Sequence, residues 1–319
     1  MKEEGDRVRA VTIPRYGGID VLTVAAIPEP MPAPGEVVVR VVAAAVNPTD
    51  VLLRRGLQAK FLGEIHPPFV PGMDFCGIVE ALGSDDSEFR VGTPVIGAMS
   101  AWRPGGGAQA EIICVPAASM VVAPSALSAT EASTLPMNGL TASASLTKLD
   151  LPVGGSVVVV GAAGAVGGLA VELAVDLGLN VVAVAGDRDR EVVEKMGAHH
   201  FVAQGKGAFD EVRHVFPDGV DGLIDAANVG SAVLRAVRDQ GRVVRMMPYT
   251  EETEREITVD RVFVVDNLSD TAALRHIRDM ANRGTVTARV AAELPVDEVR
   301  AAHELIERKG SRGRPVLVF

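Results

Sequence analysis

Hydrophobic positions follow two different rhythms along this chain, and the change comes near residue 126. Before it, short runs rich in β-branched residues, such as EVVVRVVAAAV (36–46), are separated by Pro and Gly, which is typical of strands joined by turns. After it, all-apolar runs such as SVVVVG (156–161) and NVVAVAG (180–186) alternate with stretches of helical period. All-apolar strands that alternate with helices indicate a parallel sheet covered on both faces.

These rhythms predict an α/β protein with two domains. The 319 residues suffice for two domains of ordinary size, and the early strands suggest a partly closed β-rich domain. The later segments GLIDAA (222–227) and RVVRMM (242–247) continue the strand–helix alternation. Ser128 and Glu131 have the spacing of a capping box at the start of a helix.

Composition narrows the function classes. A net charge of −10 argues against nucleic acid, because phosphate binding needs clustered Lys and Arg. The two cysteines, Cys76 and Cys114, are typical of buried thiols in a reducing cytosol. The longest uncharged apolar run, 157–171, is shorter than the roughly 18–20 residues of a membrane span, and the N-terminus lacks a signal peptide's apolar core. We therefore expect a soluble, cytoplasmic protein with neither nucleic acid nor membrane as partner.

A glycine-containing turn joins the first parallel strand to its helix. Compared with G-x-G-x-x-G, the run is Ala162, Ala163, Gly164, Ala165, Val166 and Gly167, with Ala162 in the first glycine's place. Gly164 would let the backbone approach a pyrophosphate, and Gly167 would let helix and strand pack closely. The helix N-terminus would offer free N–H groups to the phosphates. The strand–turn–helix context predicts a dinucleotide site, with a tight turn that binds nothing as the alternative.

The end of the second parallel strand bears on the choice of cofactor. An acid at the strand tip would bind the adenosine ribose and favour NAD, but Gly186 occupies the tip and Asp187 follows one residue later. Arg188 and Arg190 come next, and either guanidinium can pair with a 2′-phosphate. This favours NADPH, with NADH as the less favoured alternative because of Asp187. The same stretch also fits a solvated helix start with charge pairs four residues apart.

With these residues identified, the chain resembles the medium-chain dehydrogenase/reductase superfamily, and most of all its zinc-free quinone oxidoreductase branch. The similarity rests on RYGGIDVL, VNPTDVLLRRG (46–56), PFVPGMDFCGIV (68–79), GGGAQAEIICVP (105–116), LPMNGLTASASL (135–146), VVVVGAAGAVGG and GRPVLVF. The resemblance implies a GroES-like substrate domain of twisted strands from 1–125 and 286–319. It implies an NADP-binding, doubly wound Rossmann domain over 126–285, with the active cleft where the two domains join. It also implies a homodimer through the edge strand 257–265, because a long apolar edge needs a partner.

Metal chemistry is not expected. Zinc-dependent relatives carry ligands at the positions of Asn47, Met73 and Met137–Asn138, and these side chains are not zinc ligands. None of the six histidines pairs with Cys or Asp at ligand spacing, and His199 with His200 is expected to be a loop pair. A zinc alcohol dehydrogenase is therefore the least favoured interpretation.

The resemblance also implies roles for three polar residues. Asn47 would lie near the nicotinamide or the substrate carbonyl. Asp50 would be the nearby acid, although it equally fits an anchor for the backbone of its own turn. Thr141 would line the cofactor, with a helix-surface or capping role as the alternative.

Several positions depart from the family pattern. Many relatives place a Tyr where Leu52 stands, and Gln204 replaces a Tyr that contacts the adenosine phosphate in some relatives. Tyr16 is then the candidate proton donor, or else a surface aromatic. Met246 and Met247 follow a strand and would form a soft pocket against the nicotinamide, with ordinary strand-end packing as the alternative.

The sequence thus predicts a zinc-independent reductase that transfers hydride from NADPH to a quinone or an α,β-unsaturated carbonyl. Such acceptors are already electrophilic, so the protein supplies mainly position and electrostatics. The missing Tyr and the MNG at 137–139 favour a specialised variant, a biosynthetic enoyl reductase. The alternative from another class is an NADP(H)-binding sensor or complex subunit without turnover. The identity of the acceptor is not encoded in any motif.

Overall fold

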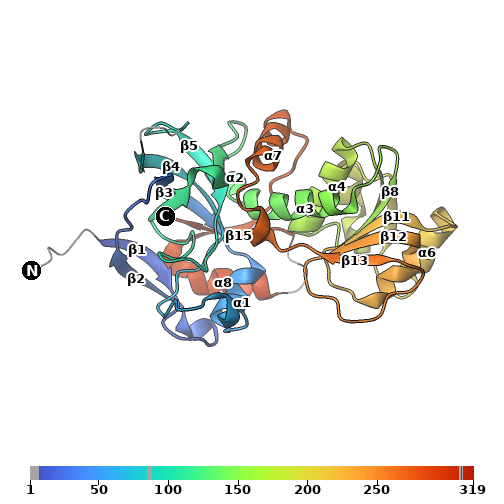
Figure 1. Ribbon diagram of the computed structural model, residues 1–319, viewed down its shortest axis with the longest axis horizontal. Coiled ribbons are helices and arrows are strands. Elements are labelled where there is room, and N and C mark those ends of the chain that lie inside the picture. The colour runs from blue at the N-terminus through green and yellow to red at the C-terminus, as the bar shows by residue number, and fades with distance from the viewer. Residues whose placement is uncertain (1–6, 85–87, 309, 311) are drawn as a thin grey trace, which may run out of the picture. The chain divides into compact units, whose positions relative to one another are not determined.

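The computed structural model describes residues 7–84, 88–308, 310 and 312–319 (Figure 1). The chain forms two compact units. Unit 1 comprises Met1–Met137, Leu268–Asn282 and Ala288–Phe319, and unit 2 comprises Asn138–Asn267 and Arg283–Thr287. Among the described residues, no helix combines the length and the apolar character that a membrane crossing requires.

Unit 2 contains a six-stranded parallel sheet in the order β10-β9-β8-β11-β12-β13. Its strands are β8 (Ser156–Val160), β9 (Asn180–Ala185), β10 (His200–Ala203), β11 (Val220–Asp225), β12 (Val237–Arg245) and β13 (Thr258–Arg261). The first strand lies in the middle and the chain adds strands outward on both sides. This is the order of the doubly wound dinucleotide fold, as predicted.

Helices cover both faces of this sheet, which explains why its strands are apolar throughout. Val158 and Val160 pack with α6 (Ala208–Val215) and the 3₁₀ helix η5 (Ser231–Ala236) in one buried cluster. The alternate residues of β8 point to the other face, where α4 (Ala165–Asp176) contacts β8 and β9. Figure 1 shows α4 and α6 on opposite sides of the sheet. This unit also contains α5 (Arg190–Lys195). It contains most of α3 (Pro136–Leu149), whose first two residues belong to unit 1.

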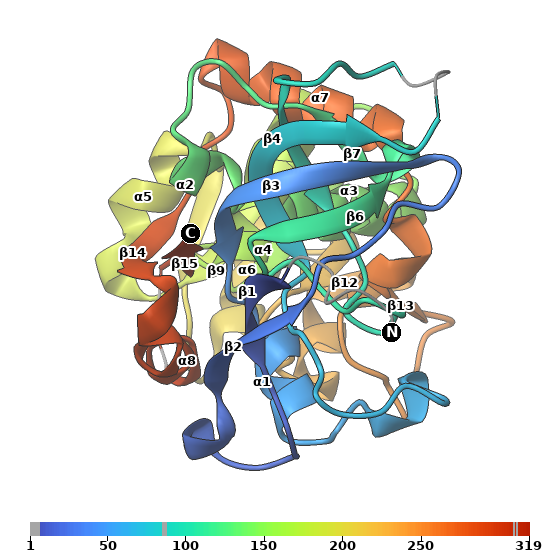
Figure 2. The same cartoon turned by 90° about the vertical axis from the view of Figure 1, so that its left-hand side faces the viewer.

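Unit 1 is built on an open seven-stranded sheet whose centre is β3 (Glu36–Ala45). One edge of β3 pairs with β4 (Asp74–Leu82), while the other pairs with β6 (Ile112–Pro116) along its first half and β15 (Arg314–Val318) along its second. Figure 2 shows β3 between β4 and β6. The sheet also contains β5 (Pro94–Ala98), β7 (Met120–Val122) and β14 (Val290–Pro295), and a separate hairpin is formed by β1 (Arg7–Thr12) and β2 (Thr23–Pro28). A separate β-rich domain is confirmed, but its mixed sheet is open and not partly closed, and the C-terminal strand β15 belongs to it.

Short helices complete unit 1. They are α1 (Pro48–Arg54), α2 (Ala129–Ala132), α7 (Thr271–Arg283, most of it in this unit) and α8 (Val299–Glu307). The capping box of Ser128 and Glu131 opens α2 as predicted. The segments 126–137 and 268–282 were expected in the nucleotide-binding domain but pack in unit 1, and residues 286 and 287, expected in the substrate domain, fall in unit 2. Thr130 donates to Glu293 at 2.7 Å, and Thr271 donates to the Ala118 carbonyl at 2.7 Å.

The expected long edge strand 257–265 is shorter in the structure. Strand β13 ends at Arg261, and 264–267 form a 3₁₀ turn. Ile257, Val262 and Val264 are buried. The apolar side chains that suggested a long edge therefore pack inward instead of lining the sheet edge.

Candidate cofactor site and the buried carboxylates

The glycine turn lies at the carboxyl end of β8. Gly161 has a φ of +77°, a left-handed conformation that favours glycine. The left-handed residue of the turn is therefore Gly161, one position before Ala162, which the motif aligned with its first glycine. A Cβ added to Gly167 would lie 2.1 Å from the Gly161 carbonyl oxygen, so only glycine allows the helix to pack this closely. Gly164 is the N-cap of α4, so the glycine turn leads directly into the helix N-terminus, whose dipole favours an anion.

This turn occupies the switch point of the sheet, where ligands of doubly wound folds bind. β8 and β11 are neighbours in the middle of the sheet, and the chain leaves them toward opposite sides. The Ala226 N–H donates to the Val160 carbonyl at 3.1 Å, so the segment after β11 lies against the turn. Ala163, Ala165 and Val166, predicted to face the cofactor, all belong to this turn or the helix start.

The predicted adenosine-binding residues gather at the carboxyl ends of β9 and β10. Gly186 follows β9 directly, and the Gln204 N–H donates to the Ala185 carbonyl at 2.7 Å. The side chains of Arg188 and Arg190 are largely exposed, and the Arg190 guanidinium carbon lies 4.1 Å from the centre of the Phe201 ring.

An acid that sequence reasoning missed stands at this strand tip. Asp189 is buried, and a Cβ added to Gly186 would lie 3.1 Å from its Oδ2. Asp187, the acid named from the sequence, begins a 3₁₀ turn and is exposed. The 3₁₀ turn reverses the direction of the chain, and the Asp189 N–H donates to the Gly186 carbonyl at 2.8 Å. Asp189 therefore faces the carboxyl end of β9. The three-residue spacing from Gly186 was the available signal.

Asp50 is buried in unit 1, and its carboxylate accepts hydrogen bonds from the surrounding backbone. Its Oδ2 accepts from the Asn47 N–H at 2.7 Å, which closes the capping box of α1, and its Oδ1 accepts from the Gly72 N–H at 2.8 Å. Gln109 donates to Oδ2 at 3.3 Å. Burial raises the pKa of Asp50 to about 6, although the two backbone donors oppose the shift. The contacts are those of the anchor that the sequence left open as an alternative to an acid.

Asp74 is a second buried carboxylate, and it was not among the predicted site residues. Its Oδ2 accepts from Asn47 Nδ2 at 3.0 Å, and its Oδ1 accepts from the Met137 N–H. Burial raises the pKa of Asp74 to about 7, against the donor hydrogen bonds and the Arg314 charge. The signal in the sequence was a lone acid that opens the otherwise apolar run DFCGIV.

Asn47 is held from both ends of its amide. Arg314 Nε donates to Asn47 Oδ1 at 2.8 Å, while Nδ2 donates to Asp74. The side chain is fully buried. Oδ1 and Nδ2 each already have one partner inside the protein, and a contact with a nicotinamide or a substrate carbonyl, the role implied by the resemblance, stays a prediction.

The other predicted residues have the following surroundings. Tyr16 is 40% exposed and stacks on Phe69 with ring centroids 5.4 Å apart. Thr141 is buried in α3. Met246 and Met247 follow the last residue of β12, and Met247 is exposed. Their catalytic and cofactor-binding roles stay predictions.

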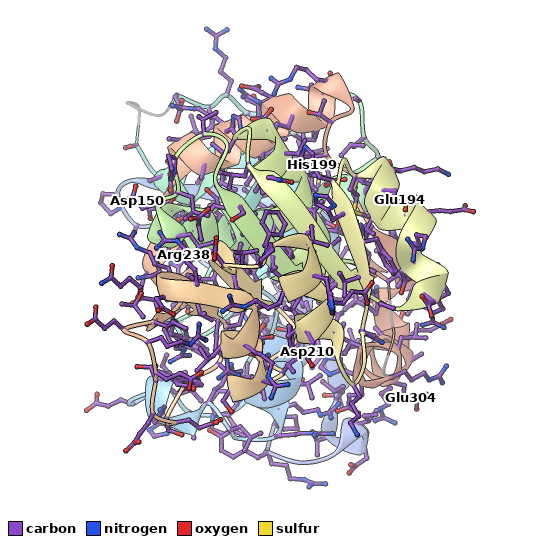
Figure 3. All side chains as sticks on the ribbon, turned by 90° about the vertical axis from the view of Figure 1, so that its right-hand side faces the viewer. Asp150, Glu194, His199, Asp210, Arg238 and Glu304 are labelled. Atoms are coloured by element: carbon purple, nitrogen blue, oxygen red, sulfur yellow. The ribbon has the colours of Figure 1, made fainter. Side chains whose placement is uncertain are left out.

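His199 and His200 have structural contacts. The Val181 N–H donates to His199 Nδ1 at 3.1 Å, and His200, the first residue of β10, makes an edge contact with Phe216. Figure 3 labels His199 among the charged and polar side chains of unit 2, which include exposed Asp150, Glu194 and Asp210.

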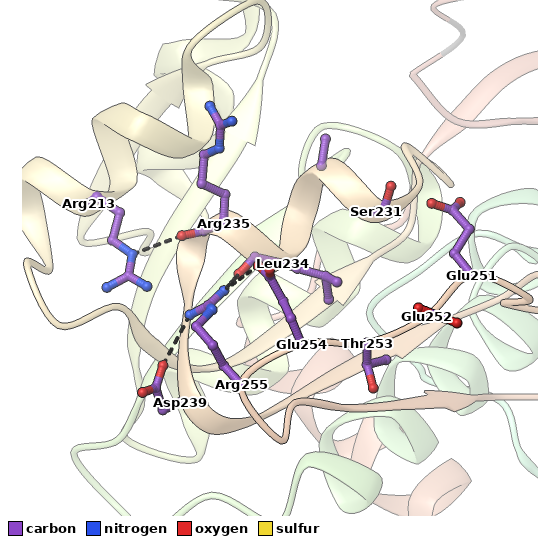
Figure 4. Close-up of a pocket in the computed structure, with 11 residues that line it drawn as sticks. Arg213, Ser231, Leu234, Arg235, Asp239, Glu251, Glu252, Thr253, Glu254 and Arg255 are labelled. Atoms are coloured by element: carbon purple, nitrogen blue, oxygen red, sulfur yellow. Dashed lines mark hydrogen bonds and ion pairs between the residues drawn. The ribbon is translucent and has the colours of Figure 1, made fainter.

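A pocket of about 860 Å³ lies elsewhere in unit 2 (Figure 4). It is lined by Arg213 from the last turn of α6 and Asp239 from the start of β12, so it lies toward the amino ends of the strands. Its arginines are already engaged, because Arg213 Nε donates to the Arg235 carbonyl at 2.8 Å and Arg255 donates to the Leu234 carbonyl at 2.6 Å. We do not assign the cofactor to this pocket, since the glycine turn is at the carboxyl end.

Two family models match the chain. One is the alcohol dehydrogenase GroES-like domain, over residues 33–125, and the other is the zinc-binding dehydrogenase, over residues 196–317. The zinc of the second description does not fit the side chains present. Met73 and Met137 are buried thioethers at the positions in question, and within the described ranges no three His, Cys, Asp or Glu side chains gather as a metal ion requires.

Two of the matched relatives are named as oxidoreductases. The chain is 34% identical to the chloroplastic quinone-oxidoreductase QR1 of Triphysaria versicolor, over 62% of this chain and 61% of the relative. It is 30% identical to the chloroplastic NADPH-dependent alkenal/one oxidoreductase of Arabidopsis thaliana, over 72% and 60%. The chain thus spans about three fifths of the length of these curated relatives.

A solved structure matches over nearly the whole chain. It is an alcohol dehydrogenase superfamily protein from Novosphingobium aromaticivorans, with a TM-score of 0.89 and 25% identity over 98% of this chain and 99% of that one. The glycine turn at the switch point, the two family models and this match agree. The chain belongs to the medium-chain dehydrogenase/reductase superfamily, among the relatives of its quinone and alkenal oxidoreductases.

Proposed function

We propose that the protein is a zinc-independent oxidoreductase that uses NADPH to reduce a quinone or an α,β-unsaturated carbonyl. The observation that carries the proposal is the glycine turn at the switch point, with Gly161 in a left-handed conformation and Gly167 packed on the Gly161 carbonyl. The named relatives support the acceptor class, since one is a quinone oxidoreductase and another acts on alkenals or enones.

The residues of this chain would divide the work as follows. The backbone at Gly164 and the start of α4 would hold the pyrophosphate, and the residues after β9 would hold the adenosine ribose and its phosphate. A bound nicotinamide would supply the hydride. Asn47, Asp50 and Asp74 would keep the loop before α1 in one conformation, because their polar atoms bond to one another and to backbone.

The preference for NADPH rests on two exposed arginines. Arg188 and Arg190 stand beside Gly186, and the Arg190 guanidinium lies over Phe201, a site from which it can pair with a 2′-phosphate. Buried Asp189 is the opposing feature, since an acid at the strand tip favours the free ribose hydroxyl of NADH.

The direct test is a fluorescence titration of the wild-type protein and Arg190→Ala with NADPH and NADH. We expect wild-type protein to bind NADPH more tightly, and Arg190→Ala to lose about ten-fold or more for NADPH with little change for NADH, because a charge-assisted pair is lost. An acceptor screen with quinones and enones follows. Equal losses for both cofactors would contradict the role of Arg190, and failure of both to bind wild-type protein would contradict the function itself.

A second candidate is a protein that binds NADP(H) without turnover. The observation that favours it is the enclosed Asn47 amide, bonded to both Arg314 and Asp74. Hydride transfer to any acceptor in the screen would exclude this alternative. The cytoplasmic location stays a prediction, and matched relatives include proteins named as chloroplastic and mitochondrial.

A further inference from the structure

A buried ion pair joins two neighbouring strands of unit 2 at their carboxyl ends. Figure 1 shows β11 beside β12. Asp225 is the last residue of β11 and Arg245 the last of β12, and the parallel register pairs them. The Asp225 side chain is fully buried and that of Arg245 is 7% exposed. Arg245 Nε lies 3.2 Å from Asp225 Oδ2, although the N–H is not aligned for a hydrogen bond. Removing two charges from water costs about as much free energy as their attraction in the interior contributes, so this ion pair adds little net stability. Its presence is better explained by a role other than stability.

The Asp225 carboxylate accepts hydrogen bonds from the backbone of the segment that follows β11. Both of its oxygens accept from the Val229 N–H, at 3.1 and 2.9 Å. Asn228 and Gly230 in the same segment have φ values of +54° and +97°. Asp225 therefore ties Val229, within the segment 226–230, to the end of β11.

This segment borders the glycine turn. The Ala226 N–H donates to the Val160 carbonyl, and a Cβ added to Gly161 would lie 3.2 Å from the Ala227 Cβ. In the doubly wound order, β9 and β10 lie on the adenosine side of the turn, whereas β11 and β12 lie on the other side. The segment held by Asp225 thus belongs to the nicotinamide half of the site.

Arg245 is fixed from a second direction. Its guanidinium carbon lies 5.3 Å from the centre of the Tyr249 ring, in a cation–π contact. The guanidinium is therefore held between Tyr249 and Asp225, and it restricts where the Asp225 carboxylate can point.

We propose that Arg245 is a positioning residue for the nicotinamide half of the cofactor, acting through Asp225 on the segment 226–230. The inference rests on the proposed function, because it presupposes that a nicotinamide cofactor binds. The Arg245 side chain is enclosed by protein, so it would affect cofactor binding through the segment 226–230 that it orders.

The experiment compares NADPH with 2′,5′-ADP, which carries only the adenosine half and its 2′-phosphate. Calorimetric titrations would be made on wild-type protein, Arg245→Met and Arg245→Lys. For Arg245→Met we expect NADPH binding to weaken about ten-fold or more, with 2′,5′-ADP within about two-fold of wild type, since only one half of the site is disordered. Arg245→Lys, which keeps the charge, should recover part of the loss.

Arg242→Met is the matched control. Arg242 lies on the same strand, is 45% exposed and pairs with Asp150 at 3.6 Å, so its loss should leave both ligands at wild-type affinity. If Arg245→Met does not fold, Asp225→Asn combined with Arg245→Met leaves no uncompensated buried charge and carries the same comparison.

The outcomes separate the inference from the function on which it rests. Unchanged NADPH binding in the folded variant, or equal losses for NADPH and 2′,5′-ADP, would overturn the positioning role while leaving the proposed function intact. If wild-type protein binds neither ligand, the proposed function fails and the inference with it.

Discussion

Two buried carboxylates, Asp50 and Asp74, set the electrostatics of unit 1 at the residue scale. Both have a pKa well above the ordinary value for Asp because burial disfavours the charged form, and the Arg314 charge only partly offsets this. The fold tolerates them because each carboxylate oxygen accepts at least one hydrogen bond. Met73, directly before Asp74 in the chain, is thus next to a buried polar network.

The raised pKa values predict how stability depends on pH. An Asp with a higher pKa in the folded state contributes stability that is complete below about pH 4 and is lost as the pH rises through about 6 to 7. Asp74→Asn should remove most of this decline, on the order of a few kcal/mol, because Asn does not ionise. The measurement is urea unfolding of both proteins at several pH values between 4.5 and 8.

The contribution of His303 to stability changes with pH in the opposite direction to that of Asp74. The prediction therefore concerns the difference in the free energy of unfolding between wild type and Asp74→Asn at each pH. Burial and the Arg54 charge lower the pKa of His303 to about 3, which makes its contribution to stability fall as the pH falls below about 6.5. His303 is present in both proteins and cancels. Parallel pH profiles for wild type and Asp74→Asn would contradict a raised pKa at Asp74.

At the element scale, α1 and α8 are joined by a buried polar contact. Arg54 of α1 is 1% exposed, and its Nη2 donates to Glu307 of α8 at 2.5 Å. Its Nη1 lies 3.2 Å from Nδ1 of His303, a side chain with no exposed surface. An arginine cation next to this nitrogen keeps the histidine neutral, so Nδ1 accepts the bond. Helix α8 is therefore attached to α1 by hydrogen bonds as well as by apolar packing.

This contact predicts a stability difference between two adjacent arginines. Arg54→Met should lower the free energy of unfolding by about 2–4 kcal/mol, because it removes one partner from a buried polar group. Arg55→Met is the matched control, since Arg55 donates to the same Glu307 oxygen at 2.8 Å from a side chain that is 53% exposed. Its loss should cost less than about 1 kcal/mol. Urea unfolding at neutral pH measures both, and equal effects would show that burial of Arg54 carries no special weight.

At the scale of the whole molecule, the sheet of unit 2 ends in a strand with one unpaired side. β13 pairs only with β12 among the described strands, and it is four residues long. An unpaired edge invites a second chain, and symmetric homodimers are the commonest assemblies of soluble proteins. We propose that two copies pair through β13, as the family resemblance implies.

Sedimentation equilibrium tests this dimer. The chain mass is 33.3 kDa, and we expect twice that value for wild-type protein. Thr258→Lys should shift the equilibrium toward monomer, because a two-fold contact brings both added charges together. Val122→Lys, an exposed change on the edge strand β7 of unit 1, serves as control. A monomeric wild-type protein, or equal effects of the two changes, would argue against β13 as the interface.

Local features of the chain were predictable from the sequence alone. The alternation of apolar runs and helical stretches determined the parallel sheet, and the three-residue spacing of Ser128 and Glu131 determined a helix start. The glycine turn was recognised because the backbone geometry it needs depends on a few adjacent residues, and its left-handed residue is Gly161, one position before Ala162. Patterns of this kind involve residues within one turn or one strand, so they can be interpreted without knowledge of the tertiary structure.

The tertiary structure alone decided which distant side chains meet. Asn47, Asp74 and Arg314 come from three separated segments, and they meet because β3 pairs with both β4 and β15. Asp225 and Arg245 meet because the register of β11 and β12 aligns their last residues. Strand register depends on the summed packing of a whole sheet, which no single motif encodes. The sequence therefore determined the scaffold and its glycine turn, whereas the buried polar contacts around them were set by how the strands pair.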